Sequence, residues 1–118
     1  MSYKSFEDLE VWKEACRVSI EIYRLLKNCK DYGLRDQMTR AAVSIASNIA
    51  EGAERDSRAE FARFLHIAKG SAAELRTQLY IASHIGVLSV GDSSRLGEEV
   101  KVISKKLHGL IKHLKLKT

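Results

Sequence analysis

The sequence RAAVSIASNIAEG, residues 40–52, decides the fold because it combines helical spacing with side chains that are almost all small. One apolar row recurs at intervals of four and three residues, as on one face of a helix, and comprises Met38, Ala42, Ile45 and Ile49. A second row on the adjacent face comprises Val43, Ala46, Ala50 and Ala53. Small side chains require neighbouring helices to come close, and two rows require two packing partners.

The composition predicts one all-α domain spanning residues 1–118. The chain has 45% hydrophobic and 30% charged residues, no proline and only seven glycines, so its helices meet few interruptions. No stretch reaches the roughly 18 apolar residues that a membrane span needs, and the N-terminus lacks the features of a signal peptide. We therefore expect a cytoplasmic protein with no membrane partner, in which Cys16 and Cys29 are reduced structural thiols.

Helical patterns and capping residues predict two helices in the first half of the chain. The first helix begins after Ser5, which forms a capping box with Asp8, and runs to about Asn28. Two apolar rows give it a wide apolar arc, one of Leu9, Trp12, Cys16, Tyr23 and Leu26 and the other of Val11, Ala15, Val18, Ile22 and Leu25. The second helix covers about residues 34–55 and contains the small-residue stretch.

Two longer helices are expected in the second half. Ser57 and Glu60 form a capping box that opens the third helix, and Gly86 ends it. Asp92 is the predicted cap of a fourth helix with the apolar row Leu96, Val100, Ile103, Leu107, Leu110 and Leu114. Four helices with short connections predict an antiparallel up-down-up-down bundle.

The first two helices carry more apolar surface than such a bundle needs. A helix in a four-helix monomer needs one apolar stripe, whereas each of these has two. Contiguous exposed apolar surface usually marks an interface, so we expect a cyclic homo-oligomer held together mainly by the first and second helices. A broad monomeric core is the alternative.

Three segments make the sequence resemble a known family, the four-helix-bundle proteins encoded in intervening sequences of bacterial 23S ribosomal RNA genes. They are FEDLEVWKEA at residues 6–15, AAVSIASNIAEGAER at residues 41–55 and EFARFLHIAKGSAAELRTQL at residues 60–79. The resemblance implies a cyclic homopentamer without enzymatic activity. The accessory proteins of diversity-generating retroelements are similar in fold and form basic pentamers that bind RNA and a reverse transcriptase.

Polar stripes on the second and third helices offer a candidate contact between them. The stripe on the second helix comprises Arg40, Ser44, Ser47 and Glu51 with Asn48 beside it, and the stripe on the third comprises Ser71, Glu74 and Gln78. If the stripes face each other, Arg40 can pair with Glu74 and Asn48 can link the two backbones. The alternatives are two solvated helix sides or a pocket of Asn48, Glu51 and Glu74.

Arg55, Arg58 and Arg63 flank the turn into the third helix, where free amides favour an anion. Interleaved acidic residues offer an alternative explanation, local salt bridges.

The sequence contains no recognisable catalytic or metal-binding motif. The four histidines, His66, His84, His108 and His113, do not share a metal-ligand spacing. No phosphate-binding loop, HExxH motif or glycine-framed nucleophile is present. We expect no enzyme activity, no cofactor, no metal and no small-molecule substrate.

The positive charge is concentrated at the C-terminal end. Residues 100–118 hold six lysines and no acid, whereas residues 1–99 hold 14 basic and 15 acidic side chains and sum to −1. Such a segment attracts polyanions, although lysines at a helix C-terminus are also favoured by the helix dipole. Lys101, Lys105 and Lys112 share one face by spacing, with Lys106 slightly aside, and these four are the candidate nucleic-acid-binding residues.

Two functional hypotheses follow. The first is a non-catalytic homo-oligomer that binds structured RNA or a ribonucleoprotein partner through its basic surface, with affinity that falls steeply with salt. The second is an oligomeric scaffold for a protein partner, in which the lysines serve only solubility.

Overall fold

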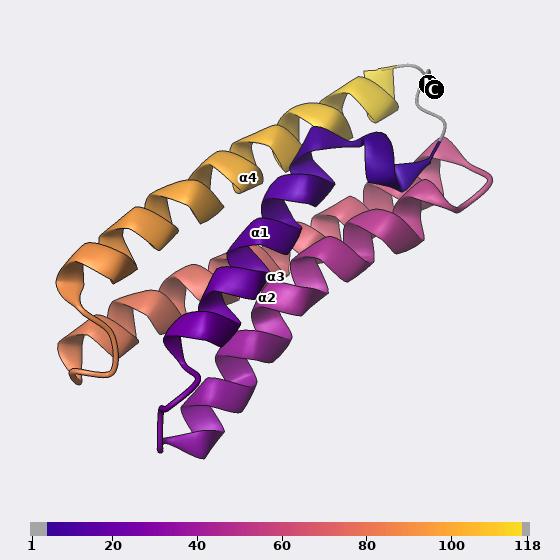
Figure 1. The fold of residues 1–118 in the computed structure, drawn as a ribbon. Helices are drawn as coiled ribbons and strands as arrows, with labels where there is room; N and C mark the ends of the chain where they lie inside the picture. Colours follow the sequence, from indigo (N-terminus) through magenta and orange to yellow (C-terminus); the bar gives the residue numbers. More distant parts are fainter. Residues whose placement is uncertain (1–4, 117–118) are drawn as a thin grey trace.

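A computed structural model describes residues 5–116 as four antiparallel helices that run alongside one another (Figure 1). The elements are the short 3₁₀ helix η1 (Phe6–Asp8) and the α-helices α1 (Glu10–Leu25), α2 (Tyr32–Ala53), α3 (Arg58–His84) and α4 (Val90–Leu116). Each α-helix packs on the one before it, and α4 returns to pack on α1. The up-down-up-down bundle is confirmed. Lys117 lies outside the described residues.

Capping residues explain where the first two helices begin. Ser5 and Asp8 form the predicted capping box, but the box caps η1, because Leu9 adopts an extended backbone with φ −77° and ψ 122° and separates η1 from α1. The single first helix predicted from sequence is therefore wrong at its N-terminus, and α1 also ends earlier, at Leu25. The Asp31 carboxylate accepts a hydrogen bond from the Leu34 amide at 3.1 Å, so α2 begins at Tyr32.

The boundaries of α3 follow the sequence prediction, whereas the cap of α4 does not. The Ser57 hydroxyl accepts a hydrogen bond from the Glu60 amide at 3.0 Å, and Gly86 follows α3 with a φ of +78°, which favours glycine. Asp92 is not the cap of α4. Ser89 takes that role by accepting a hydrogen bond from the Asp92 amide at 3.0 Å, so the cap of α4 lies three residues earlier than expected.

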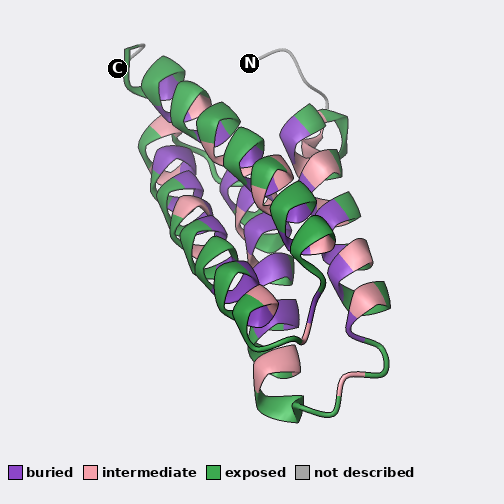
Figure 2. Cartoon of the chain, turned by 90° about the vertical axis from the view of Figure 1, so that its left-hand side faces the viewer, coloured by how far each residue is buried: buried purple, intermediate pink, exposed green. Residues whose placement is uncertain are grey.

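The core lies along the bundle axis, where the four helices turn their buried sides toward one another (Figure 2). From α2 it takes the predicted row of Met38, Ala42, Ile45 and Ile49, and from α1 it takes Val11, Ala15, Val18 and Ile22. In α4, Ile111 is buried at 3% exposure, whereas the predicted Leu110 is only partly buried. A straight helix rotates gradually relative to a strict heptad pattern. Toward the end of α4 the position that faces the core has therefore shifted from Leu110 to Ile111.

None of the helices within residues 5–116 is long and apolar enough to cross a membrane.

Candidate functional site

The apolar row of α1 that contains Trp12 and Cys16 faces outward beside α2. Trp12 and Cys16 are half-buried, whereas Ile20 and Tyr23 are 51% and 55% exposed. On α2, Val43 is 40% exposed. A groove of about 370 Å³ lies between the two helices, lined by Trp12, Cys16, Ser19, Ile20, Val43, Ala46, Ser47 and Ala50. The apolar surplus predicted from sequence therefore exists in the isolated chain; below, these residues are called the α1–α2 groove.

Burial in this groove affects the Cys16 thiol. Desolvation raises the pKa of Cys16, because the apolar surroundings disfavour the charged thiolate. At neutral pH the thiol therefore stays protonated and behaves as a packing group.

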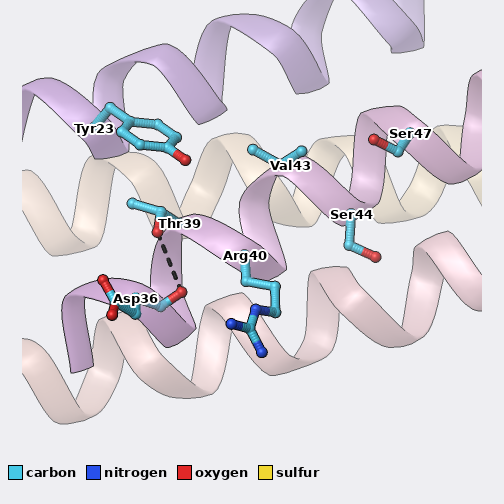
Figure 3. A pocket seen from close by; sticks show the side chains of 7 residues that line it. All are labelled: Tyr23, Asp36, Thr39, Arg40, Val43, Ser44 and Ser47. Carbon is cyan, nitrogen blue, oxygen red and sulfur yellow. Dashed lines mark hydrogen bonds between the residues drawn. The ribbon is translucent and has the colours of Figure 1, made fainter. Parts of the chain in front are cut away.

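A wider hollow of about 540 Å³ continues from this groove toward the start of α2 (Figure 3). Tyr23 reaches it from α1, while Arg40 extends away from the tyrosine. The Thr39 hydroxyl donates to the carbonyls of Arg35 and Asp36 at 2.9 and 3.2 Å, so its proton is committed to its own helix. These side chains do not form a nucleophile with an adjacent base, and the hollow has the features of a surface depression.

The polar stripes of α2 and α3 do meet, but through serines. The hydroxyls of Ser44 and Ser71 are 2.8 Å apart. The Asn48 amide donates to Ser44 of its own helix, at 2.8 Å to the carbonyl and 3.0 Å to the hydroxyl, so it does not link the backbones as predicted. Arg40 and Glu74 are exposed, and no ion pair joins them in the described chain.

The arginines around the turn into α3 have separate roles. Arg63 forms an ion pair with Glu60 at 3.1 Å, and this hydrogen bond lowers the pKa of Glu60 and raises that of Arg63. The guanidinium carbons of Arg55 and Arg63 lie 4.8 and 4.6 Å from the centre of the Phe64 ring. Arg58 instead reaches α4, where its Nε donates to the Leu114 carbonyl at 3.4 Å. The local salt-bridge explanation therefore holds for Arg63 and not for Arg58.

The four candidate lysines divide into two groups. Lys101, Lys105 and Lys112 are exposed, and none of them takes part in an ion pair within residues 5–116. Lys106 points to α1, where its ammonium lies 2.6 Å from the Glu14 carboxylate. The Glu14 side chain is only 19% exposed. Lys106 thus ties α4 to α1, while the other three remain available.

A second row of basic side chains lies on α3 and adjoins the lysines of α4. His66 and Arg76 are exposed and Lys69 is partly buried, and their three-and-seven spacing puts them on one flank of α3. The Lys69 ammonium is 3.3 Å from Nδ1 of His108, a residue that shares the lysine row of α4. Nearer the end of α4, His66 and Lys115 line the same pocket. The two rows therefore touch at Lys69 and His108 and border one common pocket.

We call this combined surface the basic face. It comprises His66, Lys69 and Arg76 of α3 with Lys101, Lys105, His108, Lys112 and Lys115 of α4. The sequence analysis missed the α3 contribution, because the contact of Lys69 with His108 joins two helices and cannot be seen along one of them. The spacing of His66, Lys69 and Arg76 was the available clue.

Most of the acidic side chains near α4 lie on its other flank, against α1, and the exception is exposed Glu98, three residues before Lys101. Arg95 lies 2.6 Å from Glu21 and 3.2 Å from Asp92, and these two hydrogen bonds raise the pKa of the arginine. Arg17 pairs with Glu99 at 3.7 Å. Charges along the α1–α4 seam are thus mutually compensated, whereas the three available lysines lie on the basic face. Within residues 5–116, no group of three His, Cys, Asp or Glu side chains is placed to hold a metal ion.

The fold and these two surfaces define an antiparallel four-helix-bundle protein with an apolar groove on one side and a basic face on another. The chain matches the family of 23S rRNA-intervening sequence proteins over residues 7–109, and it belongs to that family.

A solved structure supports the same fold. The chain is similar to a protein of unknown function from the S23 ribosomal protein family of Bacteroides thetaiotaomicron VPI-5482, whose crystal structure was determined at 1.70 Å resolution. The TM-score is 0.81 at 25% sequence identity, over 86% of this chain and 98% of the other. Comparison with curated proteins gave no significant match.

Proposed function

We propose that this protein is a cytoplasmic, non-catalytic homo-oligomer that binds structured RNA, alone or within a ribonucleoprotein, through its basic face. The observation that carries the proposal is the separation of charge on α4. Lys101, Lys105 and Lys112 lie on one flank and form no ion pair within residues 5–116, with exposed Glu98 at the start of that row, whereas Glu14, Glu21, Asp92 and Glu99 are paired on the other flank. A row of uncompensated cations is complementary to a phosphate backbone.

The kind of readout follows from the side chains available. The basic face offers ammonium, guanidinium and imidazole groups, which contact phosphates and carry little sequence information. Tyr80 is exposed on α3, but its ring packs on that of His84 with the ring centres 4.3 Å apart, so the basic face itself presents no free aromatic platform for bases. We therefore assign recognition to the shape and backbone of a folded RNA.

Oligomerisation is the second part of the proposal. Trp12, Ile20 and Val43 leave apolar area uncovered in the isolated chain, and a second copy that covers it would remove this area from water. The resemblance noted above favours a pentamer. Repeating the basic face around a ring would turn several weak phosphate contacts into one strong interaction.

The test is RNA binding by a variant that removes only the unpaired lysines. We expect Lys101→Ala, Lys105→Ala and Lys112→Ala together to weaken binding of a structured RNA at least about tenfold at low salt, and to reduce the slope of log affinity against log salt by about three. Fluorescence anisotropy at several salt concentrations measures both quantities.

The matched control removes three exposed lysines elsewhere, Lys13, Lys27 and Lys30, by alanine substitution. Each triple variant takes the formal net charge of the chain from +5 to +2, so a general charge effect weakens both equally. Equal weakening, or no binding by the unaltered protein, overturns the assignment. In the latter case the α1–α2 groove supports the alternative function, an oligomeric scaffold for a protein partner.

A further inference from the structure

A pocket of about 320 Å³ lies at one end of the basic face, where α3 begins and α4 ends. Its apolar walls are formed by the small side chains of Ala59 and Ala62 and by Leu114, whose side chain is buried in the core. Its polar part includes Arg58, His66 and Lys115. None of its lining residues carries a carboxylate. The pocket thus combines apolar walls with positive charge supplied by two different helices.

Arg58 is held in place at this pocket. Its Nε donates to the Leu114 carbonyl, one of the last carbonyls of α4, which the helix itself leaves without an amide partner. The two terminal nitrogens of the guanidinium make no hydrogen bond within the described chain. Arg58 therefore offers two preoriented donors to an incoming anion at a small entropic cost.

Arg63 borders the same pocket, but its guanidinium is directed to Glu60 and Phe64, which do not line it. Its guanidinium is bound to Glu60 at 3.1 and 3.2 Å and lies over the Phe64 ring, so its charge is largely compensated and its orientation fixed. The cations left to act on a ligand of this pocket are therefore those of Arg58 and Lys115, beside the apolar walls of Ala59 and Ala62. The pocket is therefore complementary to a flat apolar ring that carries a negatively charged group.

The position of the pocket narrows the choice of ligand. His66 and Lys115 belong both to the pocket and to the basic face, so a polyanion lying on that face extends directly into the pocket. We propose that the pocket receives a single unpaired nucleotide of a bound RNA, with its base against Ala59 and Ala62 and its phosphate at Arg58 and Lys115. This inference rests on the proposed function, because the paired part of the RNA occupies the basic face.

The test compares two RNA hairpins that differ by one nucleotide. One has a fully paired stem, and the other carries a single 2-aminopurine bulge in that stem. We expect the unaltered protein to bind the bulged hairpin about five- to tenfold more tightly, and to change the 2-aminopurine fluorescence as the base enters the pocket.

A pocket-filling variant locates the effect. Ala59 is exposed, so Ala59→Leu fills the pocket without entering the core, and we expect it to abolish the preference while the paired hairpin binds as before. Thr77→Leu adds a leucine at an exposed position of α3 outside the pocket and is expected to keep the preference. Circular dichroism establishes that both variants are folded.

The outcomes separate the two proposals. Equal affinity of the unaltered protein for both hairpins overturns the pocket assignment and leaves the proposed function standing. A preference that survives in Ala59→Leu overturns the location. No binding of either hairpin overturns both.

Discussion

At the scale of single residues, Gly52 sets how closely α2 and α3 approach. A Cβ atom at this position would lie 2.7 Å from Cβ of Phe64 and 3.2 Å from the Phe61 carbonyl oxygen, distances that require backbone movement. Alanine normally stabilises a helix relative to glycine by roughly 0.5–1 kcal/mol. At Gly52 the collision outweighs this gain, because neither a Cβ atom nor a backbone carbonyl can swing aside.

We therefore expect Gly52→Ala to lower the free energy of unfolding by about 1–3 kcal/mol. Gly70 is the control, since it lies in α3 and a Cβ atom at that position would have nothing within 4 Å of it, so Gly70→Ala is expected to raise stability by roughly 0.5–1 kcal/mol. Urea unfolding at one protein concentration measures both. A stabilised Gly52→Ala variant would contradict the close approach.

Lys106 is a second residue whose role the structure narrows. Its partner Glu14 is mostly buried, and the second carboxylate oxygen of Glu14 has no hydrogen-bond partner within the described chain. Removing the ammonium leaves a poorly solvated carboxylate without its cation.

We expect Lys106→Ala to destabilise the protein by about 1 kcal/mol and to leave RNA affinity nearly unchanged. Lys105→Ala should do the opposite, with stability within about 0.5 kcal/mol of the unaltered protein and weaker RNA binding. Chemical unfolding and anisotropy on the same preparations test both halves. If Lys106→Ala weakens RNA binding as much as Lys105→Ala, the division between the two lysines is wrong.

At the scale of the helices, the sequence predicted those features that depend on residues close together in the chain. The Ser57 cap and the apolar row of α2 were correct, because a cap involves residues three apart and a buried row follows the helical period, whereas the Glu60 half of the predicted capping box is replaced by the pairing of Glu60 with Arg63. The start of α4 was wrong because Ser89 and Asp92 are both good caps, and only the backbone path decides between them.

The candidate site depended on contacts between helices, which spacing within one helix does not contain. The α4 lysines were found from their period, but the pairing of Lys106 with Glu14 joins residues 92 positions apart. The α3 part of the basic face was missed for the same reason, since Lys69 meets His108 across 39 positions. Sequence alone therefore predicted the lysine row of α4 and could not predict which residues of α1 and α3 lie beside it.

At the scale of the whole molecule, the remaining question is what covers the α1–α2 groove. Ile20 and Val43 lie in one groove, whereas Val90, 71% exposed, lies apart from it at the start of α4. If copies of this chain cover the groove, a charge at Val43 would be buried without a partner and would oppose assembly. At Val90 the same charge stays in water and faces the N-terminal end of a helix, which favours it.

We therefore expect the unaltered protein to sediment as a multiple of its 13.3 kDa chain, Val43→Glu as a single chain and Val90→Glu like the unaltered protein. Val43→Glu leaves the basic face intact, so it separates assembly from RNA contact. Its RNA affinity should still fall by at least about tenfold, because one chain loses the high effective concentration that a ring of identical faces provides. Sedimentation and anisotropy at equal chain concentrations measure both effects. A Val43→Glu monomer that binds RNA as tightly as the assembled protein would mean that one basic face suffices, whereas unchanged assembly of Val43→Glu would place the subunit contact elsewhere on the bundle.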